Sequence, residues 1–167
     1  IAIGVPYTMT GTKFYERKEI KDVISYIKAA RNTDSWTDIK RCINTPVRGI
    51  GKTTVLKLVE GKRDELPTKA RQSVESFFSL LDTIENYTHT LTTSELVKKV
   101  LMISGIYDSY NENTEEHITR RENLEELVTL AKKYDEHASG IELFLEDVAL
   151  QSDQDTLLEE KNKKGVR

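Results

Sequence analysis

The sequence lacks several features that would mark a particular class of protein. None of its apolar runs approaches the length of a membrane span and its mean hydropathy is −0.53, so we expect no membrane partner. The single cysteine, Cys42, excludes an internal disulfide and indicates a reducing, cytoplasmic location. The three histidines, His89, His117 and His137, lie far apart with no cysteine or carboxylate at ligand spacing. The sequence therefore predicts no metal site.

Patterns of catalytic residues are missing as well. The spacing supports neither a Ser-His-Asp nor a Cys-His arrangement. Carboxylates are numerous, as in Glu115-Glu116 and Glu125-Glu126, but they lie in mixed-charge segments of helical period, which is typical of a solvated helix face. We therefore predict no catalytic residue and no bound cofactor in this chain.

What the chain does contain is helical periodicity. Only 8 glycines and 3 prolines occur in 167 residues, which suits one helical domain. Apolar residues recur every three or four positions through most of the length, and this pattern predicts an all-α fold. The expected helices are residues 16–30, residues 36–43, a short one from Lys52 to Val59, a long one opened by Pro67, one capped by Thr92 and Glu95 and ended by Gly105, one around residues 124–134, and a last one capped by Ser139 and Glu142 and carrying Leu150.

The two ends of the chain do not fit this helical pattern. Residues 4–11 resemble one β-strand with no partner strand after them, and a lone strand is not stable by itself. The chain has no initiator Met, and Gly165-Val166-Arg167 stops where an apolar strand could begin. We therefore expect a piece from the middle of a larger protein, with a short strand remnant of a host domain at its N-terminus.

The stretch from Thr45 to Thr54 imitates a nucleotide-binding loop. A P-loop needs Gly-x-x-x-x-Gly-Lys-Ser/Thr between a strand and a helix, but Pro46 occupies the first glycine position and residues 38–44 have the spacing of a helix. The pattern favours a helix-hairpin-helix instead, with Gly49-Ile50-Gly51 in the hairpin and Ile50 directed into the core. Two glycines let the backbone approach a phosphate, and a helix starting at Lys52 offers free N–H groups.

Basic residues surround this hairpin. Between Lys40 and Arg63 the sequence has seven basic residues and one acid, Glu60, a local excess of +6 in a chain whose net charge is −3. An ordinary helical turn with a solvated basic face explains the glycines alone. The glycines, the charges and the hydroxyls of Thr53 and Thr54 together favour binding of a nucleic-acid backbone.

Four blocks of the sequence, in order, resemble the UvrD/PcrA/Rep helicases of superfamily 1. The blocks are Val5-Pro6-Tyr7, then Phe14-Tyr15-Glu16-Arg17-Lys18-Glu19-Ile20-Lys21-Asp22, then Asn44-Thr45-Pro46-Val47-Arg48-Gly49-Ile50-Gly51, and finally Arg121-Glu122-Asn123-Leu124-Glu125-Glu126-Leu127 with Phe144-Leu145. The resemblance covers almost the whole chain. It implies the helical 2B subdomain, which in that family is inserted into the second motor domain, 2A.

The resemblance also implies a division of the chain and a parent activity. Residues 1–13 would be the edge of 2A and a hinge, residues 14–150 the 2B subdomain, and residues 151–167 a polar linker that returns to 2A. The parent would be an ATP-dependent 3′-to-5′ DNA helicase acting in repair or replication. Its ATP and Mg sites would lie outside this chain, so the fragment alone would not be an enzyme.

In that family the Gly-Ile-Gly hairpin contacts the backbone of duplex DNA. The resemblance assigns this role to matching residues here, namely Thr45, Arg48, Gly49, Ile50, Gly51, Lys52 and Thr53. The partners it implies are double-stranded DNA, the helicase domains 1A, 1B and 2A, and repair or replication proteins. The alternative is a helical protein-interaction module with no direct DNA contact, in which the basic cluster is only a solvated face.

Overall fold

Helices account for every regular element in the part of the chain that can be described. The computed structural model describes residues 13–165, with the backbone alone for residues 154–160 and 162–165. The helices, including two short 3-10 turns, are α2 (Lys18–Arg31), α3 (Trp36–Cys42), α4 (Lys52–Val59), η1 (Arg63–Glu65), α5 (Thr68–Thr88), α6 (Thr93–Ile103), α7 (Ile106–Ser109), α8 (Glu115–Ala131), η2 (Lys132–Tyr134) and α9 (Gly140–Gly165). The predicted all-α fold is confirmed over these residues. The predicted strand remnant lies in residues 1–12, outside the described part.

Helix α2 is the centre of the core. Its apolar positions Ile20, Val23 and Ile27 are fully buried, and it packs against α3, α5, α6 and α8. Two of its acidic side chains, Glu19 and Asp22, are also buried. A buried carboxylate is costly unless it is paired, so this helix needs cationic or amide partners from its neighbours.

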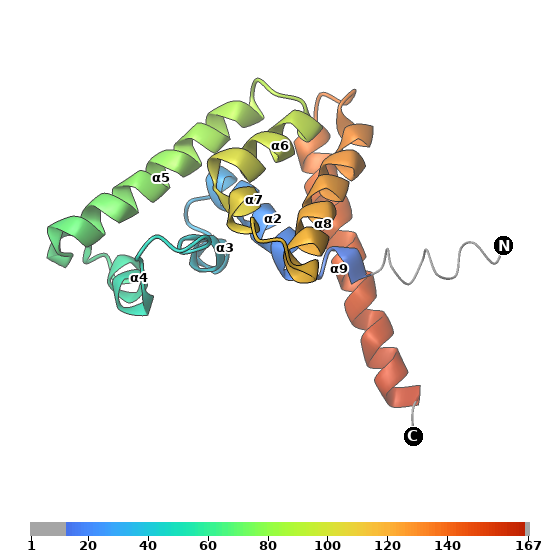
Figure 1. Ribbon diagram of the computed structural model, residues 1–167, viewed down its shortest axis with the longest axis horizontal. Coiled ribbons are helices and arrows are strands. Elements are labelled where there is room, and N and C mark those ends of the chain that lie inside the picture. Colours follow the sequence, from blue (N-terminus) through green and yellow to red (C-terminus); the bar gives the residue numbers. More distant parts are fainter. Residues whose placement is uncertain (1–12, 166–167) are drawn as a thin grey trace.

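The remaining helices surround α2 on several sides (Figure 1). The long helix α5 runs diagonally across one side of the molecule, and α4 lies beneath its N-terminal end. Helices α8 and α9 lie on the opposite side. Among the aromatic residues we expected in the core, Phe77 and Phe144 are buried, and Trp36 and Phe78 pack against the core with partial exposure.

Local signals in the sequence set several helix ends correctly. The capping box at α6 is present: the Thr92 side chain accepts from the Glu95 N–H, and the Glu95 carboxylate accepts from the Thr92 N–H. Gly105 follows α6 with a φ of 86°, the left-handed conformation that ends a helix at little cost only for glycine. Pro67 directly precedes α5, as expected.

The last helix differs from the expectation. We predicted a helix ending near Leu150 and a polar linker from residue 151, whereas α9 continues from Gly140 to Gly165. A polar composition does not stop a helix, because Glu, Lys and Gln have high helix propensity and no Pro or Gly interrupts them before Gly165. Nothing in the described residues tests where the domain boundaries fall.

Candidate nucleic-acid interface

The predicted hairpin segment is a loop, residues 43–51, between α3 and α4; we refer to it as the glycine loop. Gly49 has a φ of 79° and Gly51 an extended φ of −87°. The Thr45–Pro46 peptide bond is cis. The element before the loop is the helix α3 and not a strand, so the architecture of a P-loop is absent here, as the sequence predicted.

The Asn44 side chain shapes the glycine loop from inside. Its Oδ1 accepts hydrogen bonds from the backbone N–H groups of Arg48, at 2.6 Å, and Ile50, at 3.1 Å. The Ile50 side chain is 2% exposed and belongs to the core. We assigned Asn44 no role of its own from the sequence, since the common Asn turn bonds an N–H two residues ahead, whereas these N–H groups lie four and six residues ahead. Two N–H groups of the loop are thus used internally.

Thr45 is half-buried and forms hydrogen bonds through both its side chain and its backbone carbonyl. Its hydroxyl donates to the Arg41 carbonyl oxygen at 3.1 Å, and its own carbonyl accepts from the Tyr26 hydroxyl. Burial raises the pKa of Tyr26, so this phenol stays protonated and remains a donor. The structure therefore uses Thr45 to tie the glycine loop to α2 and α3.

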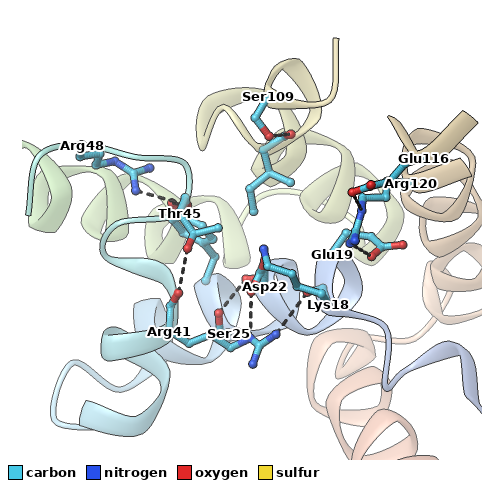
Figure 2. A network of polar contacts seen from close by, with 12 residues as sticks. Lys18, Glu19, Asp22, Ser25, Arg41, Thr45, Arg48, Ser109, Glu116 and Arg120 are labelled. Atoms are coloured by element: carbon cyan, nitrogen blue, oxygen red, sulfur yellow. Dashed lines mark hydrogen bonds and ion pairs between the residues drawn. The ribbon is translucent and has the colours of Figure 1, made fainter. Parts of the chain in front are cut away.

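Arg48, to which the family resemblance assigns a DNA-backbone contact, points toward the protein interior. Its guanidinium donates to backbone carbonyl oxygens at the end of α3 and in the loop, including that of Thr45 at 3.3 Å (Figure 2). Its Nη2 also donates to the Ser104 carbonyl at 3.0 Å. The position of Arg48 is therefore fixed by the protein itself.

The start of α4 is exposed and lacks a side-chain cap. Gly51 occupies the N-cap position without a cap hydrogen bond, and Lys52 and Thr53 are exposed. The first N–H groups of a helix have no partner within the helix, and the helix dipole gives this end a partial positive charge. A methyl group added at Gly49 or Gly51 would meet no atom within 4 Å. This end of α4 is open to an approaching anion.

Tertiary contacts reduce the number of free cations around the loop. Arg41 pairs with the buried Asp22 at 2.9 Å, Lys62 lies 3.6 Å from Glu60, and the Arg63 guanidinium lies over the Phe78 ring. Asp64 and Glu65 follow the cluster directly, and the excess over residues 40–65 is +4, from seven basic and three acidic residues. Within residues 13–165, the cations of the cluster with no ion pair, hydrogen bond or ring contact are Lys40, Lys52 and Lys57.

The sequence matches the model of a known family over nearly its full length. Residues 1–166 match the UvrD-like helicase C-terminal domain. The chain belongs to this family.

Curated relatives of this UvrD-like domain include proteins named as ATP-dependent DNA helicases. The chain is 34% identical to the ATP-dependent DNA helicase PcrA of Staphylococcus epidermidis and 33% identical to that of Staphylococcus aureus. Each match covers 91% of this chain and 24% of the relative. The chain thus spans about a quarter of the length of the curated relatives it matches.

The fold brings together two of the sequence blocks that resemble these helicases. Glu19 of the second block accepts from Asn123 of the fourth block at 2.7 Å, and Arg17 donates to Asn123 Oδ1 at 2.7 Å. Arg120 donates to the same Glu19 carboxylate at 2.9 Å (Figure 2). In this UvrD-like domain the two blocks therefore form a partly buried polar link between α2 and α8.

Reactive groups are few in the UvrD-like domain as described. Burial raises the pKa of the Cys42 thiol to about 12, so it is not a nucleophile at neutral pH. The described residues contain no group of three or more His, Cys, Asp or Glu that could hold a metal ion. In the same part of the chain, no helix has the length and hydropathy that crossing a membrane requires.

Proposed function

We propose that this UvrD-like domain is an accessory duplex-DNA-binding region of an ATP-dependent 3′-to-5′ DNA helicase. The observation that supports it best is the exposed, uncapped start of α4 beside Gly49 and Gly51, with Lys52 free of any acidic partner in the described part of the chain. This arrangement provides backbone N–H groups, a helix dipole and one cation on a single surface. All of these groups bind phosphate, and none of them reads a base edge.

The residues of the glycine loop take two kinds of role in this proposal. Gly49, Gly51, Lys52 and Thr53 contact the phosphate. Thr45 and Ile50 hold the loop to the protein, since the first is bonded at its hydroxyl and carbonyl and the second is buried.

The parent enzyme supplies the chemistry in this proposal. Residues 14–150 of this chain form a 2B-like subdomain, and the flanking residues connect it to 2A. Its partners are the helicase domains 1A, 1B and 2A and proteins of repair or replication. ATP and Mg bind to the motor domains, so the 167-residue chain alone hydrolyses no ATP. The relatives named above are ATP-dependent DNA helicases, and the chain's similarity to them supports this assignment.

A salt titration of duplex binding tests the proposal. The 167-residue chain should bind blunt duplex DNA of unrelated sequences with a similar Kd, near the weak end of the non-specific range of about 10⁻⁴–10⁻⁶ M. Lys52→Ala should weaken binding equally for all sequences and reduce the salt slope by about 1. Lys98→Ala, which removes an exposed lysine on α6, is the matched control and should leave the slope unchanged.

The second candidate function is a protein-docking module. Val47, Leu56 and Val59 are 84%, 58% and 41% exposed in the same part of the molecule, and an apolar surface favours a protein partner over a phosphate backbone. A duplex affinity that responds neither to salt nor to Lys52→Ala would favour this candidate.

Within the parent enzyme, we propose that the domain is a movable regulator. Replacing Glu16–Leu150 of the full-length enzyme by a short Gly/Ser linker should leave DNA-stimulated ATPase intact and change unwinding, because duplex contact or an inhibitory orientation is lost. Loss of ATPase in a folded deletion variant would place this segment in the motor itself.

A further inference from the structure

We infer that Arg48 is a positioning residue that holds the glycine loop in its phosphate-binding shape and does not itself bind phosphate. This inference rests on the proposed function, since it concerns how the same surface is built. It reverses the role that the position of Arg48, beside Gly49-Ile50-Gly51, suggests in the sequence.

The contacts of Arg48 leave its guanidinium little capacity for an external ligand. Nη1 lies between 3.2 and 3.4 Å from four carbonyl oxygens, and Nη2 bonds a fifth, that of Ser104, at 3.0 Å. The four oxygens near Nη1 belong to Cys42, Ile43, Thr45 and Pro46. The centre of the guanidinium lies 5.5 Å from the ring centroids of both Tyr26 and Phe77.

Two of these carbonyl groups, those of Cys42 and Ile43, lie at the C-terminal end of α3. The last carbonyls of a helix have no partner within the helix and carry the negative end of its dipole, and α3 ends at Cys42. Arg48 supplies donors to this end and to the loop that follows it. A planar guanidinium with several N–H groups in a fixed geometry serves this purpose, and the single ammonium group of lysine does not.

Arg48 also links the glycine loop, by a hydrogen bond, to a part of the chain that is distant in sequence. Ser104 lies in the turn between α6 and α7, 56 residues away in sequence. Gly105 in that turn has a φ of 86°, and a Cβ added there would lie 3.2 Å from Cγ of Pro46. The α6–α7 turn therefore supports the loop from the inner side, through Arg48 and Pro46 together.

The two possible roles of Arg48 predict different effects of Arg48→Lys. This variant keeps the positive charge but cannot reproduce the five carbonyl contacts. If Arg48 holds the loop, Arg48→Lys and Arg48→Ala should both weaken duplex binding of the 167-residue chain by about tenfold. In both variants, hydrogen exchange at the backbone amides of positions 48 and 50 should also accelerate in the absence of DNA. Without the Arg48 contacts the loop loses its shape, so Asn44 no longer holds those N–H groups.

Lys52→Ala is the matched control in this experiment. It removes a proposed phosphate contact, so it should lower the salt slope and leave the exchange of both amides unchanged. The inference is overturned if Arg48→Lys binds duplex like the wild type while Arg48→Ala lowers the salt slope by about 1 with unchanged amide exchange. Arg48 would then be a phosphate ligand.

A second pair of variants tests the inference without touching Arg48. Gly105→Ala and Gly61→Ala impose a similar backbone strain, because both glycines have a positive φ, 86° and 76°. A Cβ at Gly61 would meet no atom within 4 Å, whereas a Cβ at Gly105 would press on Pro46. Both variants should lose thermal stability through backbone strain, Gly105→Ala by at least as much as Gly61→Ala, and only Gly105→Ala should weaken duplex binding. Equal affinities of the two variants for duplex would overturn the role of the turn.

The inference and the proposed function fail in different ways. If the wild-type chain does not bind duplex DNA, the proposed function is wrong, and the amide exchange of Arg48→Lys still reports whether this side chain holds the loop. If the wild-type chain binds and exchange in Arg48→Lys is unchanged, only the inference is wrong.

Discussion

The α2–α8 contact and the glycine loop hold their charged side chains in different ways. At the contact, the Glu19 carboxylate is 3% exposed; the Arg120 guanidinium pairs with its charge, and the neutral Asn123 amide donates a hydrogen bond to it. In the loop, the Arg48 guanidinium has no carboxylate partner in the described residues and donates to backbone carbonyl oxygens. Side-chain pairs fix how two helices pack, whereas a cation held by carbonyls fixes the shape of one backbone segment. The number of basic residues therefore overstates how many cationic donor groups this surface offers to DNA.

The α2–α8 contact and helix α4, which follows the glycine loop, differ in how much apolar surface they bury. Leu124 of α8 is fully buried, whereas Leu56 of α4 is 58% exposed. Leu124→Ala should lower the free energy of unfolding by about 2–5 kcal/mol, because it loses burial and leaves a cavity. Leu56→Ala, the matched control, should change it by less than about 0.5 kcal/mol. Urea denaturation measures both, and an equal loss in the two variants would mean that the outer face of α4 is packed in solution.

The buried pair at the α2–α8 contact should produce the next largest effect. Glu19→Ala removes the acceptor of Arg120 and Asn123 and should cost about 1.5–3 kcal/mol. Glu116→Ala removes a second acceptor of the same arginine, bonded to Nε at 3.2 Å, but Glu116 is 69% exposed and should contribute less than about 0.5 kcal/mol. Similar losses in the two variants would show that burial does not decide the strength of this contact.

The N-termini of α6 and α4 should show smaller effects on stability. Thr92→Ala removes the side-chain cap of α6 and should cost about 1 kcal/mol in thermal denaturation. Gly51→Ser adds a cap to α4, where φ is −87° and no atom lies within 4 Å of the new Cβ, and should stabilise by a few tenths of a kcal/mol. The same variant should weaken duplex binding, because its side chain occupies the phosphate approach. Unchanged duplex binding would show that the phosphate does not approach the protein at the start of α4.

The smallest predicted effect is a pH dependence at α6. The N–H of Thr92 bonds the Glu95 carboxylate and lowers its pKa in the folded state. A group whose pKa is lowered by folding stabilises the protein at pH values above its unfolded pKa. This stabilisation is lost as the pH falls through the folded pKa. The difference in midpoint temperature between wild type and Glu95→Gln should therefore exist at neutral pH and close below about pH 4. A difference that persists in acid would exclude the charge as its cause.

Local signals were sufficient for most of the secondary structure. The capping box at Thr92, the stop at Gly105 and the helix beginning at Lys52 all depend on residues within one turn of each other. The extension of α9 was missed although no residue between 151 and 164 forces a helix to stop, because we predicted a linker from the polar composition. The glycine loop was located correctly, while Asn44, which bonds two of its N–H groups, was missed.

The sequence by itself determined where most of the helices form and where the glycine loop lies, because spacing, caps and glycine conformations act over a few residues. Only the tertiary structure decided which charges are free. Arg41 pairs with Asp22, Arg48 with carbonyls that include Ser104, and Lys52 with no acid in the described part of the chain. A charged side chain binds the nearest well-placed partner in space, and for Arg48 one such partner lies 56 residues away, which no local pattern encodes.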